Sequence, residues 1–184
     1  MKRVCVFCGS SNGLKPRYQE VAQALGEELV RRNMGLVYGG ANIGLMTVLA
    51  ETVLAGGGDV QGIIPDFMVE HGFARQDLSE LHVVGSMHER KALMADLSDA
   101  FIALPGGFGT LEEFCEMITL RQLRIHQKPC GLLNVDGFFD GLLTFIDHQV
   151  QEGFVTPENR SLILTSDNPA GLLDLLKKGE RQKA

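Results

Sequence analysis

Short, continuous apolar runs alternate along the chain with segments whose apolar residues recur at helical spacing. Such runs are typical of strands in a sheet that is covered on both faces, because every residue of the strand is then buried. Seven runs are predicted as strands: Val4–Cys8, Leu36–Tyr38, Val60–Ile64, Leu81–Val84, Ala100–Leu104, Cys130–Leu133 and Leu162–Thr165.

The segments between these runs have the pattern of amphipathic helices. In "YQEVAQALGEELVRR", Val21, Leu25 and Leu29 recur every four residues and define one apolar face. Three glycines, Gly56–Gly58, end the helix predicted in "LMTVLAETVLAGGG". Further helices are predicted in "HERKALMADLSD", "LEEFCEMITLRQL", "FFDGLLTFIDHQVQEG" and "AGLLDLLKKG". This alternation predicts an α/β fold, a doubly wound parallel sheet of about seven strands with helices on both faces.

The 184 residues suit one domain with a full-sized core. No linker interrupts the pattern, so residues 1–176 are predicted to form a single domain. The remaining residues, 177–184, are polar and are predicted to form a C-terminal tail.

Net charge and the lengths of the apolar runs limit which kinds of partner the protein can bind. A net charge of −6 disfavours duplex nucleic acid, which requires a basic face, but it permits a small anionic ligand. No apolar run approaches the roughly 18 residues of a membrane span. The first apolar run is also too short for a signal peptide. We therefore expect a cytoplasmic protein with no membrane or nucleic-acid partner.

Cys5 and Cys8 form a C-x-x-C pair, a spacing that also occurs in redox and zinc sites. Both cysteines lie in a predicted strand, where residues three apart point to opposite faces. No second cysteine pair or histidine pair completes a zinc site. We interpret them as buried structural residues and expect no metal.

The loops that follow the strands carry the candidate chemistry, because open α/β sheets bind ligands at the carboxyl ends of their strands. These loops are "CGSSNG" (8–13), "YGGANIG" (38–44), "GSMHERK" (85–91) and "PGGFGT" (105–110). Three are glycine-rich turns before helices, where exposed amides and the helix dipole favour an anion. The set predicts a nucleotide-sized phosphate site, although neither a P-loop nor G-x-G-x-x-G is present.

Glu113 has two interpretations. Thr110-x-x-Glu113 has the spacing of a capping box, with Thr110 as the N-cap, and Ser86-x-x-Glu89 repeats this spacing. Alternatively, Glu113 is a catalytic carboxylate beside a bound phosphate. Arg90 and Lys91 lie near a helix start, where the dipole disfavours cations. A ligand anion or neighbouring carboxylates would explain them, and a solvated helix face is the alternative.

The motifs "PGGFGTLEE" and "SMHERK" resemble the PGGxGTxxE and arginine–lysine motifs of the LONELY GUY family. The resemblance extends over nearly the whole chain, including "LVYGG", "GIIP" and "GLLNVDGFFD". It implies a Rossmann-like fold, a homodimer and no cofactor. The implied reaction cleaves the N-glycosidic bond of an adenine-type nucleoside 5′-monophosphate, giving the free base and ribose 5-phosphate.

The resemblance also assigns residues to roles. The catalytic arginine and glutamate of the family correspond to Arg90 and Glu113. The nucleotide-contacting residues of the family correspond to Lys91 and the loop Gly107–Thr110, which includes Gly109. To these we add as expected binding residues Gly9, Ser10, Gly39, Gly40, Met87, Gly106 and Glu116. Of these, Glu116 is also an alternative acid or base.

Other activities remain as alternatives. A non-enzymatic sensor could bind a nucleotide with the same loops, but phosphate binding alone gains nothing from a carboxylate at Glu113. A phosphotransferase would need an aspartate constellation for magnesium, which does not accompany these loops. Members of the family were long called lysine decarboxylases, yet no lysine is marked as a Schiff-base residue for pyridoxal phosphate.

Overall fold

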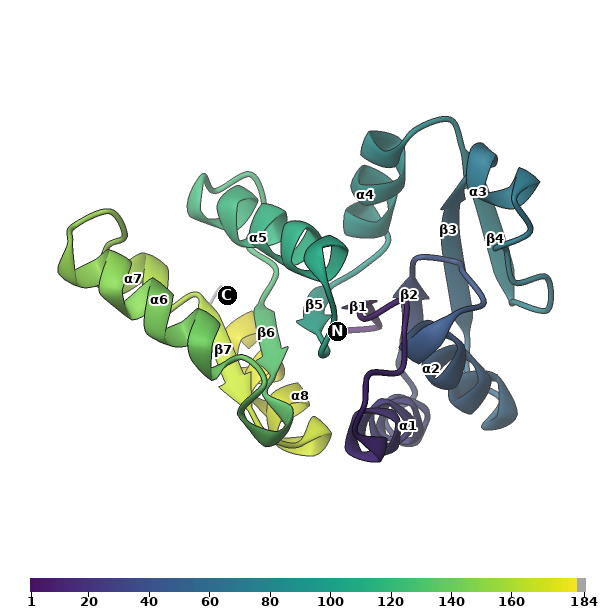
Figure 1. Ribbon diagram of the computed structural model, residues 1–184, viewed down its shortest axis with the longest axis horizontal. Helices are drawn as coiled ribbons and strands as arrows, with labels where there is room; N and C mark the ends of the chain where they lie inside the picture. Colours follow the sequence, from purple (N-terminus) through teal and green to yellow (C-terminus); the bar gives the residue numbers. More distant parts are fainter. Residues whose placement is uncertain (182–184) are drawn as a thin grey trace.

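The computed structural model describes residues 1–181 of the chain. Its seven strands form one parallel sheet in the order β4-β3-β2-β1-β5-β6-β7, as Figure 1 shows. Each predicted strand is present with bounds within one residue of those expected. The strands are β1 (Arg3–Phe7), β2 (Gly35–Tyr38), β3 (Val60–Pro65), β4 (Glu80–Val84), β5 (Ala100–Ala103), β6 (Cys130–Leu133) and β7 (Ile163–Ser166).

Helices cover both faces of this sheet, which confirms the doubly wound architecture (Figure 1). One face packs against α1 (Pro16–Arg31), α2 (Gly44–Ala55) and α8 (Pro169–Arg181). The other packs against α4 (Met87–Asp96), α5 (Phe108–Gln122) and α6 (Asp140–Gln151). Two short helices, α3 (Asp66–Glu70) and α7 (Pro157–Arg160), and the 3₁₀ turn Val135–Gly137 complete the fold. They are too short for helical periodicity to predict.

The two hydrophobic cores explain why the strands have continuous apolar sequences. On β1, Val4 and Val6 pack into the core under α1 and α2, whereas Cys5 and Phe7 pack into the core under α5. Cys5 and Cys8 therefore lie in opposite cores, as predicted, and both are buried free thiols. Burial raises the pKa of both thiols far above the usual range, so neither is a ready nucleophile.

The C-terminal segment differs from the expected tail. Helix α8 continues to Arg181, and its Leu172, Leu173 and Leu176 are fully buried against the sheet. Residues 177–181 thus extend this helix, and residues 182–184 of the predicted tail lie outside the described part of the chain. No helix within residues 1–181 is long and apolar enough to cross a bilayer.

The strand order places a crevice between β1 and β5. From β1 the chain first adds β2, β3 and β4 on one side, and later β5, β6 and β7 on the other. The loops that leave β1 and β5 therefore lead in different directions, and ligands of doubly wound sheets bind where this reversal occurs. The "CGSSNG" and "PGGFGT" loops are these two loops, and Gly9 N donates to Pro105 O between them at 3.1 Å.

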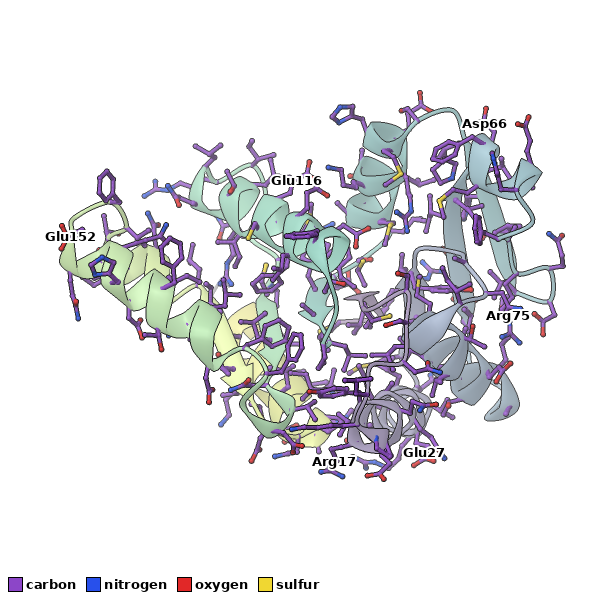
Figure 2. All side chains as sticks on the ribbon, viewed as in Figure 1. Arg17, Glu27, Asp66, Arg75, Glu116 and Glu152 are labelled. Atoms are coloured by element: carbon purple, nitrogen blue, oxygen red, sulfur yellow. The ribbon has the colours of Figure 1, made fainter. Side chains whose placement is uncertain are left out.

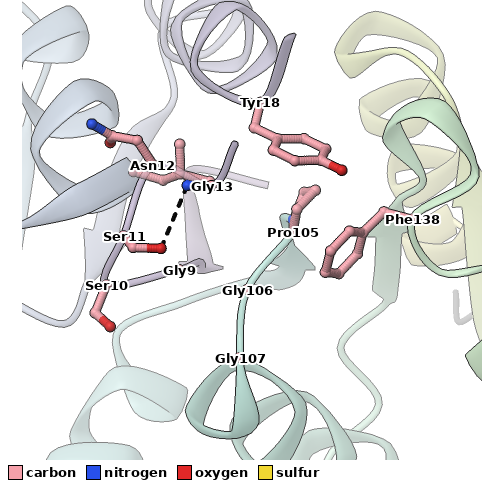
Figure 3. Close-up of a pocket in the computed structure, with 11 residues that line it drawn as sticks. Gly9, Ser10, Ser11, Asn12, Gly13, Tyr18, Pro105, Gly106, Gly107 and Phe138 are labelled. Atoms are coloured by element: carbon pink, nitrogen blue, oxygen red, sulfur yellow. Dashed lines mark hydrogen bonds between the residues drawn. The ribbon is translucent and has the colours of Figure 1, made fainter. Parts of the chain in front are cut away.

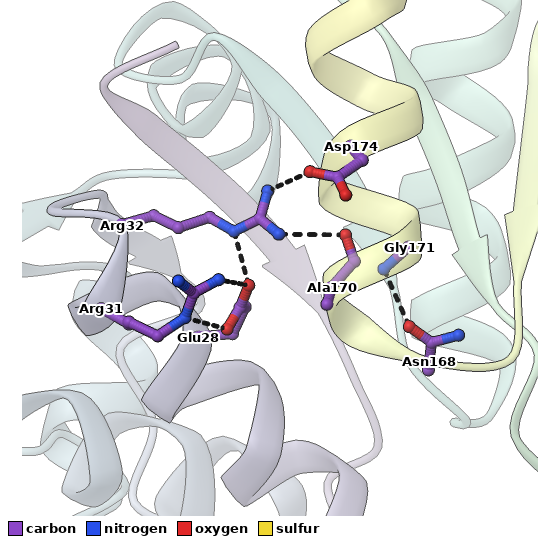
Figure 4. Close-up of polar contacts among 7 residues, drawn as sticks. All are labelled: Glu28, Arg31, Arg32, Asn168, Ala170, Gly171 and Asp174. Atoms are coloured by element: carbon purple, nitrogen blue, oxygen red, sulfur yellow. Dashed lines mark hydrogen bonds and ion pairs between the residues drawn. The ribbon is translucent and has the colours of Figure 1, made fainter.

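An ion-pair network joins the first helix of the fold to the last (Figure 4). On α1, Glu28 accepts hydrogen bonds from Arg31 Nε at 2.7 Å and Arg32 Nε at 2.6 Å. Arg32 also donates to Asp174 Oδ1 at 2.6 Å and to Ala170 O at 3.2 Å on α8. Glu28 thus orients the arginine that connects the two helices.

We predict that Glu28→Gln lowers the free energy of unfolding by about 1–2 kcal/mol at neutral pH. Hydrogen bonds from Arg31, followed by those from Arg32, lower the pKa of Glu28 to about 2 from its ordinary 4.5. A lowered pKa stabilises the fold above the unfolded-state value, and this stabilisation is lost as the pH falls toward 2.

Urea denaturation at several pH values measures this difference. Glu20→Gln is the matched control, because Glu20 also pairs with an arginine on α1, Arg17, but both side chains are more than half exposed. The explanation fails if both variants lose equal stability, or if the Glu28→Gln difference persists at the lowest pH.

Candidate active site

Arg90 is a buried cation on α4, with 8% of its surface exposed. Ser86 is the N-cap of this helix and accepts from Glu89 N at 3.1 Å, as the sequence predicts. The guanidinium crosses to the carboxyl ends of two strands. There Nε donates to Ile63 O at 3.1 Å and Nη2 donates to Gly39 O at 3.3 Å.

Gly39 is required where it lies, because a Cβ atom there would be 1.9 Å from Arg90 Nη2. Any side chain at this position would displace the guanidinium. The glycine predicted as a ligand-binding position thus has a direct role in admitting Arg90.

Glu113 lies on α5 and is also 8% exposed. The predicted capping box Thr110-x-x-Glu113 is wrong, because α5 begins at Phe108 with Gly107 as its N-cap. Thr110 is therefore inside the first turn and buried, and Gly106 has no room for a Cβ, which would be 2.1 Å from Thr110 Oγ1. Glu113 lies in the second turn and is free to face the sheet.

Arg90 and Glu113 meet across the gap between α4 and α5. Arg90 Nη1 lies 3.3 Å from Glu113 Oε1, and both side chains are about one-tenth exposed. Burial raises the pKa of Glu113 above its ordinary value, and the Arg90 charge opposes this shift. The pair is a shielded carboxylate beside a fixed cation, an arrangement common at catalytic sites.

A cavity of about 300 Å³ contains both charged side chains. Besides the pair, six of the predicted site residues line it: Ser10, Gly39, Met87, Gly107, Gly109 and Thr110. The rest of the wall is apolar and includes Ile43, Met46, Met68, Met94 and Phe108. A polar centre with apolar walls is the usual composition of a small-molecule site.

A second cavity of about 310 Å³ adjoins the first, and Ser10 and Gly107 line both. It occupies the crevice between the β1 and β5 loops, where Gly9 and Gly106 form part of its wall (Figure 3). Tyr18 and Phe138 lie on its other side with their rings 5.8 Å apart, edge to face. Together the two cavities offer a nucleotide both polar backbone and aromatic surface.

The start of α5 lies between these cavities. The first intrahelical hydrogen bond of α5 runs from Leu111 N to Gly107 O, so the preceding amides have no intrahelical partner. Glycine at 107 and 109 leaves them open, since a Cβ at either position would meet nothing within 4 Å. A helix start of this kind is suited to bind a phosphate.

Three predicted site residues do not line either cavity. Lys91 pairs with Glu112 and, at 2.8 Å, with Glu116 on α5, which Figure 2 labels. The hydrogen bond that Lys91 donates to Glu112 raises the pKa of Lys91. Gly40 follows Gly39 in the loop and has φ of +71°. Its carbonyl accepts a hydrogen bond from Arg75 N. Lys91 and Glu116 therefore join α4 to α5 beside the Arg90–Glu113 pair.

Sequence reasoning missed the apolar and aromatic walls, because cavity-facing and core-facing apolar residues follow the same helical spacing. Tyr18 and Phe138 lie in segments for which the sequence pattern predicts only helices. One signal was available for Phe138, which follows Asp136-Gly137, two residues with φ of +49° and +72° in a turn at the end of β6. Within residues 1–181, no group of three or more His, Cys, Asp or Glu could hold a metal ion.

Known proteins resemble this chain over almost its whole length. Residues 46–176 match a family described as "Possible lysine decarboxylase". The chain is 54% identical over 177 residues to a probable cytokinin riboside 5′-monophosphate phosphoribohydrolase of Oryza sativa subsp. japonica, covering 96% of this chain and 72% of the relative. It is 52% identical over 179 residues to a cytokinin riboside 5′-monophosphate phosphoribohydrolase of Arabidopsis thaliana, covering 97% and 82%.

A solved structure, the Moco carrier protein of Chlamydomonas reinhardtii, shares the fold with a TM-score of 0.72 and 18% identity over 98% of both chains. At that identity the likeness shows the Rossmann-like fold alone. The alignments with the two phosphoribohydrolases cover nearly the whole chain. The chain therefore belongs to the family of the cytokinin riboside 5′-monophosphate phosphoribohydrolases.

Proposed function

We propose that this protein hydrolyses the N-glycosidic bond of an adenine-type nucleoside 5′-monophosphate, a cytokinin riboside monophosphate or AMP, giving the free base and ribose 5-phosphate. The observation that carries this proposal is the buried Arg90–Glu113 pair, 3.3 Å apart, in a cavity next to a glycine-rich helix start. Relatives with more than half of their aligned residues identical carry names that state this activity.

The 5′-phosphate is assigned to the amides at the start of α5, from Gly107 to Thr110. Backbone N–H groups and the helix dipole supply the favourable charge there. Ser10 lines both cavities and adds a hydroxyl on the opposite side. Binding therefore depends on phosphate, and a nucleoside without it is expected to be a poor substrate.

Glu113 is assigned to the reacting sugar. When the bond between C1′ and the base breaks, the base leaves with the electron pair and positive charge develops on the ribose. A carboxylate one turn beyond the phosphate site can stabilise this charge and accept a proton from the water that bonds to C1′. The proton balance closes when the departing base is protonated.

Arg90 has two functions in this mechanism. Its contacts with the carbonyls of Gly39 and Ile63 hold it in place, and its Nη1 holds Glu113. A guanidinium has five N–H donors, so donors remain for a ribose hydroxyl or a phosphate oxygen beside these contacts and a long one from Nη1 to Met87 Sδ at 3.9 Å. The arginine thus keeps Glu113 ionised and orients the substrate.

Decarboxylation of lysine fits the site poorly. A pyridoxal phosphate enzyme needs a lysine whose neutral amine forms a Schiff base. Lys91, next to Arg90 on α4, is held by Glu112 and Glu116, and its pKa is raised rather than lowered. These contacts stabilise the charged ammonium, which cannot act as the nucleophile.

We predict that Glu113→Gln lowers kcat by at least about 100-fold while nucleotide binding survives. Purified protein is incubated with AMP, isopentenyladenosine monophosphate and adenosine, and base and ribose 5-phosphate are separated by chromatography. EDTA in the assay should leave the rate unchanged. Adenosine should release no base.

Glu112→Gln is the matched control, because Glu112 is adjacent in α5, carries the same charge and lines neither cavity. Its rate should stay within about twofold of wild type. Near-wild-type turnover by Glu113→Gln would contradict the proposal. Nucleotide binding without any base release by the wild-type protein would favour the non-enzymatic sensor.

We predict an acid limb in the profile of kcat/KM against pH, with an apparent pKa above the ordinary 4.5 of glutamate. Activity should fall as the pH drops through this value, because the protonated Glu113 can neither stabilise the cation nor accept a proton. The profile is measured by base release across buffers of constant ionic strength. A limb at or below 4.5 would exclude Glu113 as the group that titrates.

The same proposal includes a cytoplasmic homodimer. In support of the dimer, the large apolar side chains of Phe108, Leu123 and Ile125 at the two ends of α5 are 94%, 61% and 68% exposed. We predict a mass near twice that of the 20.1 kDa chain by light scattering at micromolar concentration. A single-chain mass over the whole concentration range would contradict it.

A further inference from the structure

We infer that Arg75 is a positioning residue for catalysis, which holds the loop Gly39–Asn42 so that the Gly39 carbonyl keeps Arg90 directed at Glu113. The inference rests on the catalytic roles proposed above for Arg90 and Glu113. Arg75 itself lines neither cavity. Figure 2 shows it on the side of the molecule that carries α2, β3 and β4, away from α5.

The loop requires an external support because of its own sequence. Gly39 and Gly40 have no side chains that could restrict the backbone, and Gly40 has φ of +71°. Nevertheless the carbonyl of Gly39 must stay 3.3 Å from Arg90 Nη2. Two consecutive glycines would let this peptide group rotate unless neighbouring residues fix it.

One side of the loop is fixed by the sheet. A Cβ at Gly40 would be 3.1 Å from Ile64 Cβ and 3.2 Å from Ile63 N. A Cβ at Gly62 on β3 would be 2.9 Å from Gly40 Cα. Glycines in both the loop and β3 thus let the loop pack directly on this strand. The Ile63 carbonyl of β3 also accepts a hydrogen bond from Arg90.

The other side is covered by the segment 72–77, which follows α3. Arg75 N donates to Gly40 O at 3.0 Å, and Asn42 N donates to Phe73 O at 2.9 Å. Ala41 and Ala74 form an antiparallel bridge between these two bonds. The segment therefore pairs with the loop as a short strand would.

The Arg75 side chain attaches this segment to the rest of the protein. It binds both oxygens of Asp77, with Nε to Oδ1 at 2.7 Å and Nη2 to Oδ2 at 2.9 Å. Nη1 donates to Glu51 on α2 at 3.2 Å and to Asn42 Oδ1 at 3.3 Å. The Arg75 side chain is only 10% exposed, whereas its carboxylate partners Glu51 and Asp77 are 59% and 66% exposed, so only the arginine end of these bonds is shielded from water.

A continuous series of contacts therefore runs from Arg75 to the reaction centre. The backbone N–H of Arg75 donates to the Gly40 carbonyl, the adjacent Gly39 carbonyl accepts from Arg90, and Arg90 pairs with Glu113. Without the Arg75 side chain the loop keeps its packing on β3 and its backbone bonds to the segment 72–77. It loses the side-chain bond to Asn42, and the segment loses its attachment to Glu51 on α2. Arg90 then occupies its catalytic orientation for only part of the time.

The test compares Arg75→Ala and Arg75→Lys with wild type in steady-state base release. Arg75→Ala should lower kcat by about tenfold and change KM by less than about threefold, because orientation and not phosphate binding is lost. The kcat of Arg75→Lys should lie between those of wild type and Arg75→Ala, since lysine restores one ion pair but not the bidentate contact with Asp77. Arg32→Ala is the matched control: it breaks the α1–α8 network, distant from the site, and should leave kcat unchanged.

Two further readouts separate positioning from general loss of stability. The acid limb of kcat should move to higher pH in Arg75→Ala, because a displaced Arg90 lowers the pKa of Glu113 less. The charged groups that act on Glu113 are Arg90 and Lys91 on α4 and Glu112 and Glu116 on α5. The nearby Cys5 and Cys8 thiols have raised pKa values and stay neutral in this pH range. Hydrogen exchange at the amides of Ala41 and Asn42 should accelerate in Arg75→Ala and not in Arg32→Ala.

Wild-type kcat, pH profile and amide exchange in folded Arg75→Ala would overturn the inference. A fall in kcat equal to that of Arg32→Ala, with no shift of the acid limb, would also overturn it. Failure of the proposed function is recognised separately, since Glu113→Gln would then retain activity whatever Arg75→Ala does.

Discussion

The buried guanidinium of Arg90 contacts backbone carbonyls at the ends of β2 and β3 and the carboxylate of Glu113 on α5. A buried charge is stable only when it is paired and hydrogen-bonded, so these partners cannot move independently. The absence of a side chain at Gly39 follows from the same requirement, because a Cβ there would be 1.9 Å from the guanidinium. One cation thus sets the sequence of a loop and the relative positions of two helices.

The fold supplies the place where this pair can act. The crevice between β1 and β5 is where the direction of winding reverses, and the loops there are rich in glycine. Their backbone amides are suited to bind a phosphate, whereas Arg90 and Glu113 lie under α4 and α5 on one side of that crevice. In the proposed mechanism both functions belong to neighbouring positions of α5, with phosphate binding at Gly107–Thr110 and charge at the reacting sugar from Glu113, and the substrate would span the two.

The sequence predicts the sheet well because strands buried on both faces leave continuous apolar runs, and β6 (Cys130–Leu133) has the expected bounds. The capping-box spacing Thr110-x-x-Glu113 predicts the wrong start for helix α5. There the helix begins earlier, at Phe108, because glycine replaces the side-chain cap and Thr110 turns inward against Gly106. The family resemblance assigns catalysis to Arg90 and Glu113, and the structure places both in the wall of one cavity. Lys91, for which the sequence allows a ligand anion or neighbouring carboxylates, pairs with Glu112 and Glu116 outside that cavity.

Arg75 marks the limit of such reasoning. No motif singles it out, because its partners Glu51 and Asn42 lie 24 and 33 residues away and meet it only in the folded chain. The glycines that let the loop approach Arg90 also lack the side chains that would restrict its backbone conformation. The restriction has to come from residues distant in the sequence. The segment 72–77 restricts the loop through two backbone hydrogen bonds and the side chain of Arg75. Where a site is built from glycine, the residues that define its geometry are therefore found one layer further out.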